Sequence, residues 1–89
     1  MNHETIITPI IHLNGDRRET LQNKLEAAYA AVCAAMDALR QCAPNGRNFY
    51  PEPGRMSKAE TQHQARMEHL GAVYRSLEAE SIQIDKENR

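Results

Sequence analysis

The stretch TLQNKLEAAYAAVCAAMDALRQC, residues 20–42, decides the fold. Its apolar residues recur at alternating spacings of four and three, the pattern of a helix that packs on another helix as in a coiled coil. The members of this seam are Leu21, Leu25, Ala28, Val32, Ala35, Leu39 and Cys42. Tyr29 and Met36 widen the seam to a stripe, and the alanines around Val32 favour helix and permit close approach of a neighbour.

The ends of this helix are predicted from capping signals. Asp16 followed by Glu19 has the form of a capping box, which places the start at Asp16. Pro44 and the pair Asn45-Gly46 are typical of a helix end. The sequence therefore predicts a helix over residues 16–43.

A second helix is predicted over residues 57–83. Ser57-Lys58-Ala59-Glu60 forms another capping box, and apolar residues follow at helical spacing. These residues are Met67, Leu70, Val73, Tyr74 and Leu77. His63 extends the stripe toward the start, where a histidine is more often an interfacial residue than a metal ligand. Residues 84–89 are expected to be a charged, frayed tail.

Together these elements predict an all-α fold in a single domain, residues 1–89. The two helices would form an antiparallel hairpin, joined by a loop at residues 44–56. Residues 1–15 are rich in β-branched residues and contain Pro9, so we expect an extended N-terminal arm that ends in a turn at Asn14-Gly15. Because two helices bury little apolar surface, we expect a homo-oligomer, most simply a dimer that forms a four-helix bundle.

Composition narrows the function. The 89 residues carry a net charge of −1 and no basic stripe, so we do not expect DNA binding. The apolar runs are too short for a membrane span, the start lacks the form of a signal peptide, and a cytoplasmic location is expected. Cys33 and Cys42 are expected to be buried thiols rather than a disulfide. No spacing of His or Cys predicts a metal site, and no cofactor is expected.

The stretch CAPNGRNFYPEPGR, residues 42–55, has two interpretations. In the first, its prolines stiffen a connection while Phe49 and Tyr50 close the end of the bundle. In the second it binds a ligand, because such a connection is longer than bundles usually need. Arginines bind anions, an aromatic ring stacks on a flat group, and the start of the following helix favours a phosphate. The expected binding residues here are Arg47, Asn48, Phe49, Tyr50, Arg55 and Lys58.

The stretch IHLNGDRR, residues 11–18, is a second candidate, with His12, Asn14 and Arg17 as its expected binding residues. Within one hairpin it should lie at the opposite end of the first helix from the loop. In an antiparallel dimer, however, the N-terminal turn of one subunit can approach the loop of the other. A composite site between subunits is therefore expected to couple ligand binding to assembly.

The segments IHLNG and APNGRNFYP, separated by an Ala- and Leu-rich helix, resemble a group of small phage and prophage proteins. Their pattern is HLNG[TS] followed by PNGR[DN][YF]YP, and the likeness covers about two-thirds of the chain. Asp16 stands where that pattern has Thr or Ser, which weakens an anion-binding role for this turn. The resemblance implies an inhibitor of host defence in the host cytoplasm, such as a protein that sequesters a nucleotide signal between its subunits, or else an accessory structural or regulatory protein of the phage.

Two functions from different classes are therefore expected. The first is an oligomeric, non-enzymatic protein that sequesters a nucleotide-like anion at the loop. The second is an interaction module that binds a host or phage protein through its helix faces or the 44–56 loop. An enzyme is not expected, because the sequence holds no recognisable catalytic residues: no nucleophile–base pair, P-loop or paired carboxylates on one helical face.

Overall fold

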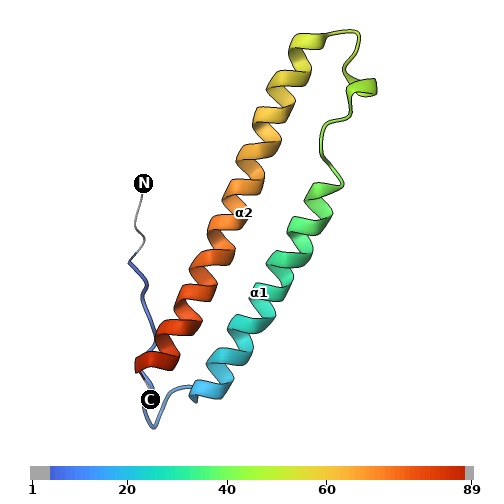
Figure 1. Ribbon diagram of the computed structural model, residues 1–89. Helices are drawn as coiled ribbons and strands as arrows, with labels where there is room; N and C mark the ends of the chain where they lie inside the picture. The colour runs from blue at the N-terminus through green and yellow to red at the C-terminus, as the bar shows by residue number, and fades with distance from the viewer. Residues whose placement is uncertain (1–4, 88–89) are drawn as a thin grey trace.

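The computed structural model describes residues 5–87 and forms a long hairpin of two helices (Figure 1). Helix α1 spans Arg18–Arg40, the short 3-10 helix η1 spans Gly46–Asn48, and helix α2 spans Pro53–Glu87. No strand occurs within residues 5–87. The all-α class and the antiparallel hairpin predicted from the apolar spacing are thus confirmed, whereas the ends of both helices differ from the prediction.

Helix α1 starts two residues later than predicted, because the expected capping box does not form. Arg17 occupies the N-cap position and its side chain makes no capping bond. The carboxylate of Asp16 instead accepts a hydrogen bond from Nζ of Lys24 at 2.9 Å. At the other end the α-helix stops at Arg40, and residues 41–43 continue as tighter turns that bond three residues back.

Helix α2 starts at Pro53, four residues before the predicted cap at Ser57. Proline is favoured at the first helical position, because its missing N–H would have no partner there and its φ angle already suits a helix. Ser57 lies inside the helix, where its carbonyl accepts a hydrogen bond from the hydroxyl of Thr61 at 3.1 Å. The segment between the two α-helices is therefore residues 41–52 rather than residues 44–56.

The predicted tail is also helical as far as Glu87. Ile84 has no exposed surface, which makes it the one fully buried large side chain in the described part of the chain. Asp85 lies 3.8 Å from a guanidinium nitrogen of Arg18, and Glu87 accepts hydrogen bonds from Thr8 at 2.6 Å and from Gln83 at 3.1 Å. Packing and pairing hold this last turn in helical form where charge alone predicts fraying.

Residues 5–17 form neither helix nor strand and run beside the C-terminal end of α2 (Figure 1). The Thr8–Glu87 hydrogen bond joins the two segments. The turn predicted at Asn14-Gly15 is confirmed, since the N–H of Gly15 bonds to the carbonyl of His12 at 3.1 Å. A Cβ at Gly15 would lie 2.8 Å from the His12 ring, so glycine lets the ring fold over this turn. The first four residues of the predicted arm lie outside the described residues.

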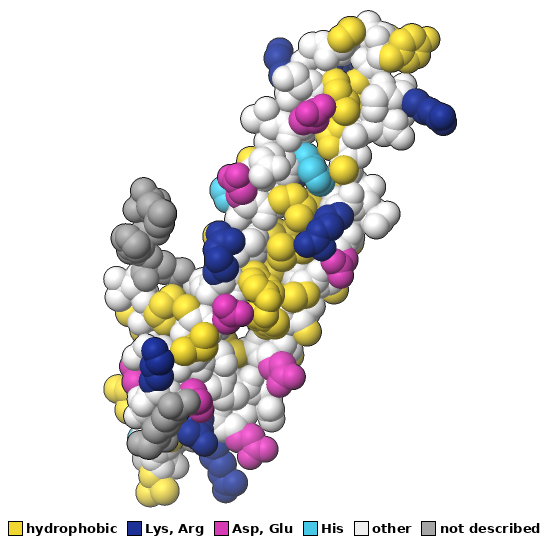
Figure 2. All heavy atoms as spheres, in the orientation of Figure 1, with side chains coloured by type: hydrophobic (Ala, Val, Ile, Leu, Met, Phe, Trp, Pro, Cys, Tyr) yellow, Lys and Arg dark blue, Asp and Glu magenta, His cyan; other side chains and the backbone are white. Residues whose placement is uncertain are grey.

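The two α-helices pack along one half-buried seam, visible in Figure 2 as a line of hydrophobic side chains between them. The α1 members are Gln22, Leu25, Tyr29, Val32, Met36 and Leu39. The α2 members are Met56, Ala59, His63, Met67, Leu70, Tyr74, Leu77, Ser81 and Ile84. Spacings of three and four persist, but Tyr29 and Met36 replace Ala28 and Ala35 as seam members, because the larger side chains bury more apolar area. Val73, expected on the stripe, is 47% exposed.

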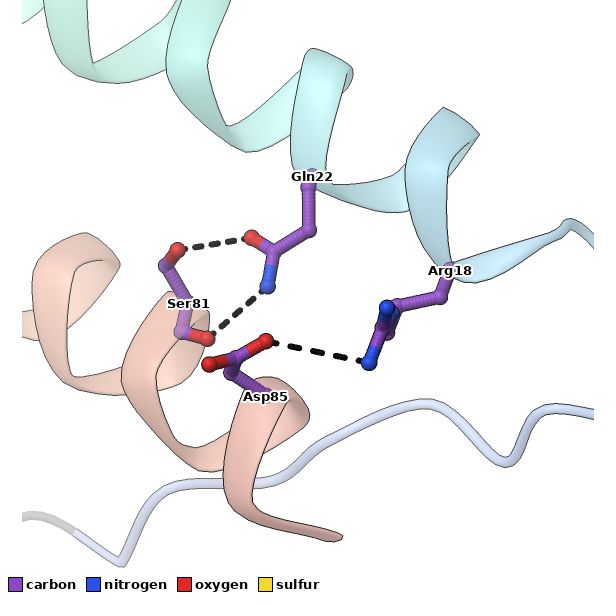
Figure 3. A network of polar contacts seen from close by, with 4 residues as sticks. All are labelled: Arg18, Gln22, Ser81 and Asp85. Carbon is purple, nitrogen blue, oxygen red and sulfur yellow. Dashed lines mark hydrogen bonds and ion pairs between the residues drawn. The ribbon is translucent and has the colours of Figure 1, made fainter. Parts of the chain in front are cut away.

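Polar pairs fix the register of the hairpin. Near its open end the Gln22 amide donates to the Ser81 carbonyl at 2.9 Å and accepts from the Ser81 hydroxyl at 2.6 Å (Figure 3). Farther along, the rings of Tyr29 and Tyr74 lie 4.2 Å apart and their hydroxyl groups are hydrogen-bonded to each other. A step of seven residues forward in α1 is thus matched by seven back in α2.

The chain is elongated, and most side chains of its seam remain partly exposed to solvent. The Cα radius of gyration is 18.4 Å, whereas a compact domain of this length would have about 12 Å. The accessible surface is 7183 Å², against about 5,300 Å² for a compact monomer of the same mass. Cys33 is half-buried and Cys42 is exposed, both as free thiols, so the expectation of two buried thiols is wrong for Cys42. Neither α1 nor α2 is long and apolar enough to cross a membrane, within the residues described.

Candidate functional site

The segment between α1 and α2 is ordered by its own backbone and by one side chain. The side-chain oxygen of Asn45 accepts a hydrogen bond from the N–H of Arg47 at 2.9 Å, which caps η1. The N–H of Phe49 bonds to the carbonyl of Gly46 at 3.1 Å, and the N–H of Glu52 bonds to the carbonyl of Phe49 at 2.9 Å. These successive turns bring the chain back to the start of α2.

Between this segment and α2 lies a cavity of about 250 Å³, which we call the loop-end cavity. Its lining residues are Cys42, Ala43, Pro44, Asn45, Asn48, Phe49, Ala59, Gln62, His63 and Arg66. A guanidinium, an imidazole, three carboxamides and one aromatic ring therefore surround a single space. This set can hydrogen-bond an anionic group and stack a flat one.

The loop-end cavity contains two of the residues expected from the sequence, Asn48 and Phe49. Phe49 is half-buried, and with Asn48 it also lines a neighbouring hollow of about 170 Å³ that includes Arg55. The ring thus packs and at the same time forms a wall of the site, so the two interpretations of this residue are compatible. Arg47 and Tyr50 line neither space, and Tyr50 is 79% exposed.

The anion site expected at the start of α2 is not available as predicted. The first turn of the helix comes before Lys58, and the residue that precedes the helix is Glu52. The carboxylate of Glu52 pairs with Arg55 at 3.0 Å. Because a carboxylate already lies beside both the helix start and Arg55, that end of the loop is poorly suited to a second anion.

The basic groups near the loop divide into paired and unpaired ones. Arg40 pairs with Asp37, and Arg55 pairs with Glu52. Among residues 5–87, no ion pair involves Arg47, Lys58 or Arg66. Arg66 is the unpaired cation that lines the loop-end cavity. It is therefore the cation of the candidate site that is free to pair with an anion.

Sequence reasoning missed Arg66 and placed His63 only on the packing stripe. These two residues can be assigned to the site only when the register of the hairpin is known. The pairs Gln22–Ser81 and Tyr29–Tyr74 show that residues near 63 on α2 lie at the height of the C-terminal end of α1. Once that register is known, His63 and Arg66 fall beside the loop.

The second candidate region lies at the other end of the molecule (Figure 1). His12, Asn14 and Arg17 are all exposed there. The long axis of the molecule measures 63 Å, and α1 separates the two regions. As expected for a single hairpin, one chain does not bring the two sets of residues together.

Other spaces are less suited to a ligand. A hollow of about 480 Å³ on α2 is lined by residues of that helix alone, including Glu60 and Glu68, so it is neither enclosed nor attractive to an anion. No group of three or more His, Cys, Asp or Glu side chains is arranged to hold a metal ion anywhere in residues 5–87.

The environment of Tyr29 differs from that of the other tyrosines. Its hydroxyl bonds to Tyr74 and lies 3.5 Å from a carboxylate oxygen of Glu78. The hydrogen bond to Tyr74, followed by burial, raises the pKa of Tyr29 above its ordinary value. The pair keeps both rings in place at the centre of the seam, far from the loop-end cavity.

Comparison with protein-family models, with curated proteins and with solved structures gave no match.

Proposed function

We propose that this chain is a non-enzymatic binding protein that holds a small anionic ligand at the loop-end cavity and works as a homo-oligomer. The observation that carries the proposal is the cavity itself, where Arg66, His63 and the amides of Asn45 and Asn48 surround a space walled by Phe49. Arg66 supplies the charge, the amides supply hydrogen bonds, and the ring supplies a stacking surface for a base or another planar group.

The volume of the cavity bears on ligand size. At about 250 Å³ it is smaller than the roughly 300–1,000 Å³ of usual ligand pockets. A phosphate or carboxylate with part of its attached group fits inside one chain. A nucleotide-sized ligand needs a further wall, which a second copy would supply with His12, Asn14 and Arg17. The phage-protein resemblance extends the proposal to sequestration of a nucleotide-like signal of host defence in the host cytoplasm.

A second candidate function is supported by the surface at the other end. Ile7, Ile10 and Leu13 are 76%, 82% and 99% exposed, three large apolar side chains within seven residues. Large apolar side chains that are exposed to water favour contact with another protein. These three residues support the interaction module, in which a host or phage protein binds the segment before α1.

Isothermal titration calorimetry with inorganic phosphate, AMP and a cyclic dinucleotide tests the ligand proposal. We expect saturable binding of at least one of these, and we expect Arg66→Ala to weaken it about ten- to hundredfold, the range for loss of a charged hydrogen bond. Arg47→Ala tests the neighbouring unpaired cation in the same way. The control is Arg75→Ala, which removes an exposed arginine of the same helix outside the cavity.

The absence of saturable binding to all three probes would refute the ligand proposal. Equal loss of binding in Arg66→Ala and Arg75→Ala would also refute the assigned site. A pulldown in which a host or phage protein binds the wild-type chain but not Leu13→Asp would then support the interaction module.

A further inference from the structure

The loop-end cavity is lined by polar groups but by no carboxylate, since none of its lining residues is Asp or Glu. Arg66 can only donate hydrogen bonds, whereas a carboxamide can donate or accept. Among residues 5–87, the side chains of Asn48, Gln62 and Arg66 form no hydrogen bond or ion pair with the rest of the chain. The orientation of the amides therefore decides which ligand groups the cavity can bind.

Asn45 differs from the other two amides because one end of it is already held. Its side-chain oxygen accepts a hydrogen bond from the N–H of Arg47 at 2.9 Å. An N–H needs an acceptor, so this contact also determines which end of the amide is the oxygen and which is the nitrogen. In a planar carboxamide the NH2 group points away from the bond that the oxygen makes. The group that Asn45 has left for a ligand is therefore an NH2 with two donors.

The held polar groups of the cavity are thus donors, and they come from two different segments. Asn45 lies between the two α-helices, and Arg66 lies on α2. A negatively charged group whose oxygens all accept hydrogen bonds satisfies these donors. An O–H on the same group meets no carboxylate that accepts it, and an amide that turns its oxygen toward the O–H no longer donates to the anion.

We infer that Asn45 determines the ligand specificity of the loop-end cavity and selects an oxyanion that carries no proton, such as a sulfate or a phosphodiester, over a protonated phosphate. The inference rests on the proposed function and names the chemical class of its ligand. The bound oxyanion joins the loop, through Asn45, to α2, through Arg66.

This class also distinguishes among nucleotide-like ligands. Both free oxygens of a phosphodiester only accept hydrogen bonds. A terminal phosphate monoester has a second pKa of about 6 and still carries a proton for part of the time near neutral pH. The donors around the cavity therefore favour a phosphodiester over a terminal phosphate, while Phe49 remains the wall for a planar group.

Isothermal titration calorimetry with sodium sulfate and with sodium phosphate at about pH 8 tests the specificity. Both anions are mainly dianions of similar size under these conditions, and they differ by the single O–H of phosphate. We expect the wild-type chain to bind sulfate about two- to tenfold more tightly than phosphate, the range for one hydrogen bond.

The variant Asn45→Asp should reverse this preference without removing the loop contact. Aspartate retains an oxygen that accepts the N–H of Arg47, and it replaces the two donors with an acceptor. Sulfate then faces a carboxylate with no proton between them, whereas the O–H of phosphate can donate to it. We expect sulfate binding to weaken at least about tenfold more than phosphate binding. The control Asn23→Asp makes the same change of charge at an exposed position of α1 outside the cavity and should leave the ratio of the two affinities unchanged.

A second variant, Asn45→Ser, adds no charge. Serine also supplies an oxygen for the N–H of Arg47 but has no NH2 group, so sulfate binding should weaken about two- to tenfold. Circular dichroism checks that all variants keep the helicity of the wild type.

The outcomes separate this inference from the proposed function. Tighter binding of phosphate than of sulfate by the wild-type chain would overturn the inference. So would an unchanged affinity ratio in Asn45→Asp, an equal change of that ratio in Asn23→Asp, or full sulfate binding by Asn45→Ser. In each of these cases the chain still binds an anion, and the proposed function stands. A wild-type chain that binds neither anion would refute the proposed function and the inference together.

Discussion

The outward surfaces of α1 and α2 differ although both helices share the same seam. On α1 the exposed residues between Glu26 and Asp37 are all alanine. On α2 the exposed surface over a similar length, residues 58–69, includes Lys58, Glu60, Gln62, Gln64, Arg66, Glu68 and His69. The charged and amide groups exposed on α2 form hydrogen bonds with water, whereas the methyl groups exposed on α1 form none. In the proposed homo-oligomer, this difference makes α1 the helix that we expect to face a second copy and α2 the helix that we expect to face water.

The largest expected effect on stability is on α2, where a buried isoleucine can be compared with an exposed one. Ile84 is fully buried, whereas Ile82 is 50% exposed. We expect Ile84→Ala to lower the free energy of unfolding by about 2–4 kcal/mol, from lost burial and the resulting cavity. The control Ile82→Ala should change it by less than about 0.5 kcal/mol. Urea denaturation followed by circular dichroism measures both, and similar losses would mean that Ile82 is also covered.

A matched pair of charges compares the outward surfaces directly. Ala35 on α1 and Ala65 on α2 are both exposed. If α1 is covered by a second copy, Ala35→Lys should lower stability by about 2–3 kcal/mol at concentrations a hundredfold above the dimer Kd, because the stabilisation by association is lost. Ala65→Lys should stay within about 0.5 kcal/mol of wild type. Thermal unfolding at two protein concentrations checks this, since only the associating protein shows a concentration-dependent midpoint.

Much of the architecture could be predicted from the sequence. Spacings of three and four gave both helices and the hairpin, because apolar periodicity reflects burial directly. The residues at which the helices start were harder to predict. Asp16 can cap a helix or pair with Lys24, and the ion pair is what forms. At α2, Pro53 was the stronger start signal, and its position before Gly54-Arg55 concealed it among the loop prolines.

The candidate site was predicted only in part. Asn48 and Phe49 were expected from the loop and do line the cavity. His63 and Arg66 come from α2, and their place beside the loop depends on the register set by pairs such as Tyr29–Tyr74. Apolar spacing restricts that register to steps of about one heptad, which is why a sequence pattern alone leaves the choice open.

A smaller effect is expected at Gly71, a buried glycine inside α2. A Cβ there would meet only the guanidinium of Arg75, at 3.2 Å, and that exposed side chain can move aside. Alanine should therefore stabilise the helix by about 0.5–1 kcal/mol, the usual cost of glycine in a helix interior. In the background Arg75→Ala the gain from Gly71→Ala should be at least as large. A loss of stability in both backgrounds would show that a second chain approaches Gly71, and α2 would then not be the outside.

The smallest effect concerns pH. The pKa of Tyr29 is raised, chiefly by its hydrogen bond to Tyr74. The stabilisation from the neutral hydroxyl is thus fully present below the ordinary tyrosine pKa of about 10 and is lost as pH rises above it. Alkaline titration of phenolate absorbance should show Tyr29 ionising at higher pH in wild type than in Tyr74→Phe. The control Tyr50→Phe, at an exposed position, should keep the late transition, and its loss there would contradict the assignment.

The most direct test of the central claim, that this hairpin is completed by a second copy of itself, is sedimentation equilibrium of the wild-type chain at micromolar concentration, with helicity checked by circular dichroism. The chain mass is 10.1 kDa. We predict a helical species of about 20 kDa or a higher multiple, as the proposed homo-oligomer requires. A fully helical protein that sediments at the mass of one chain would contradict the account.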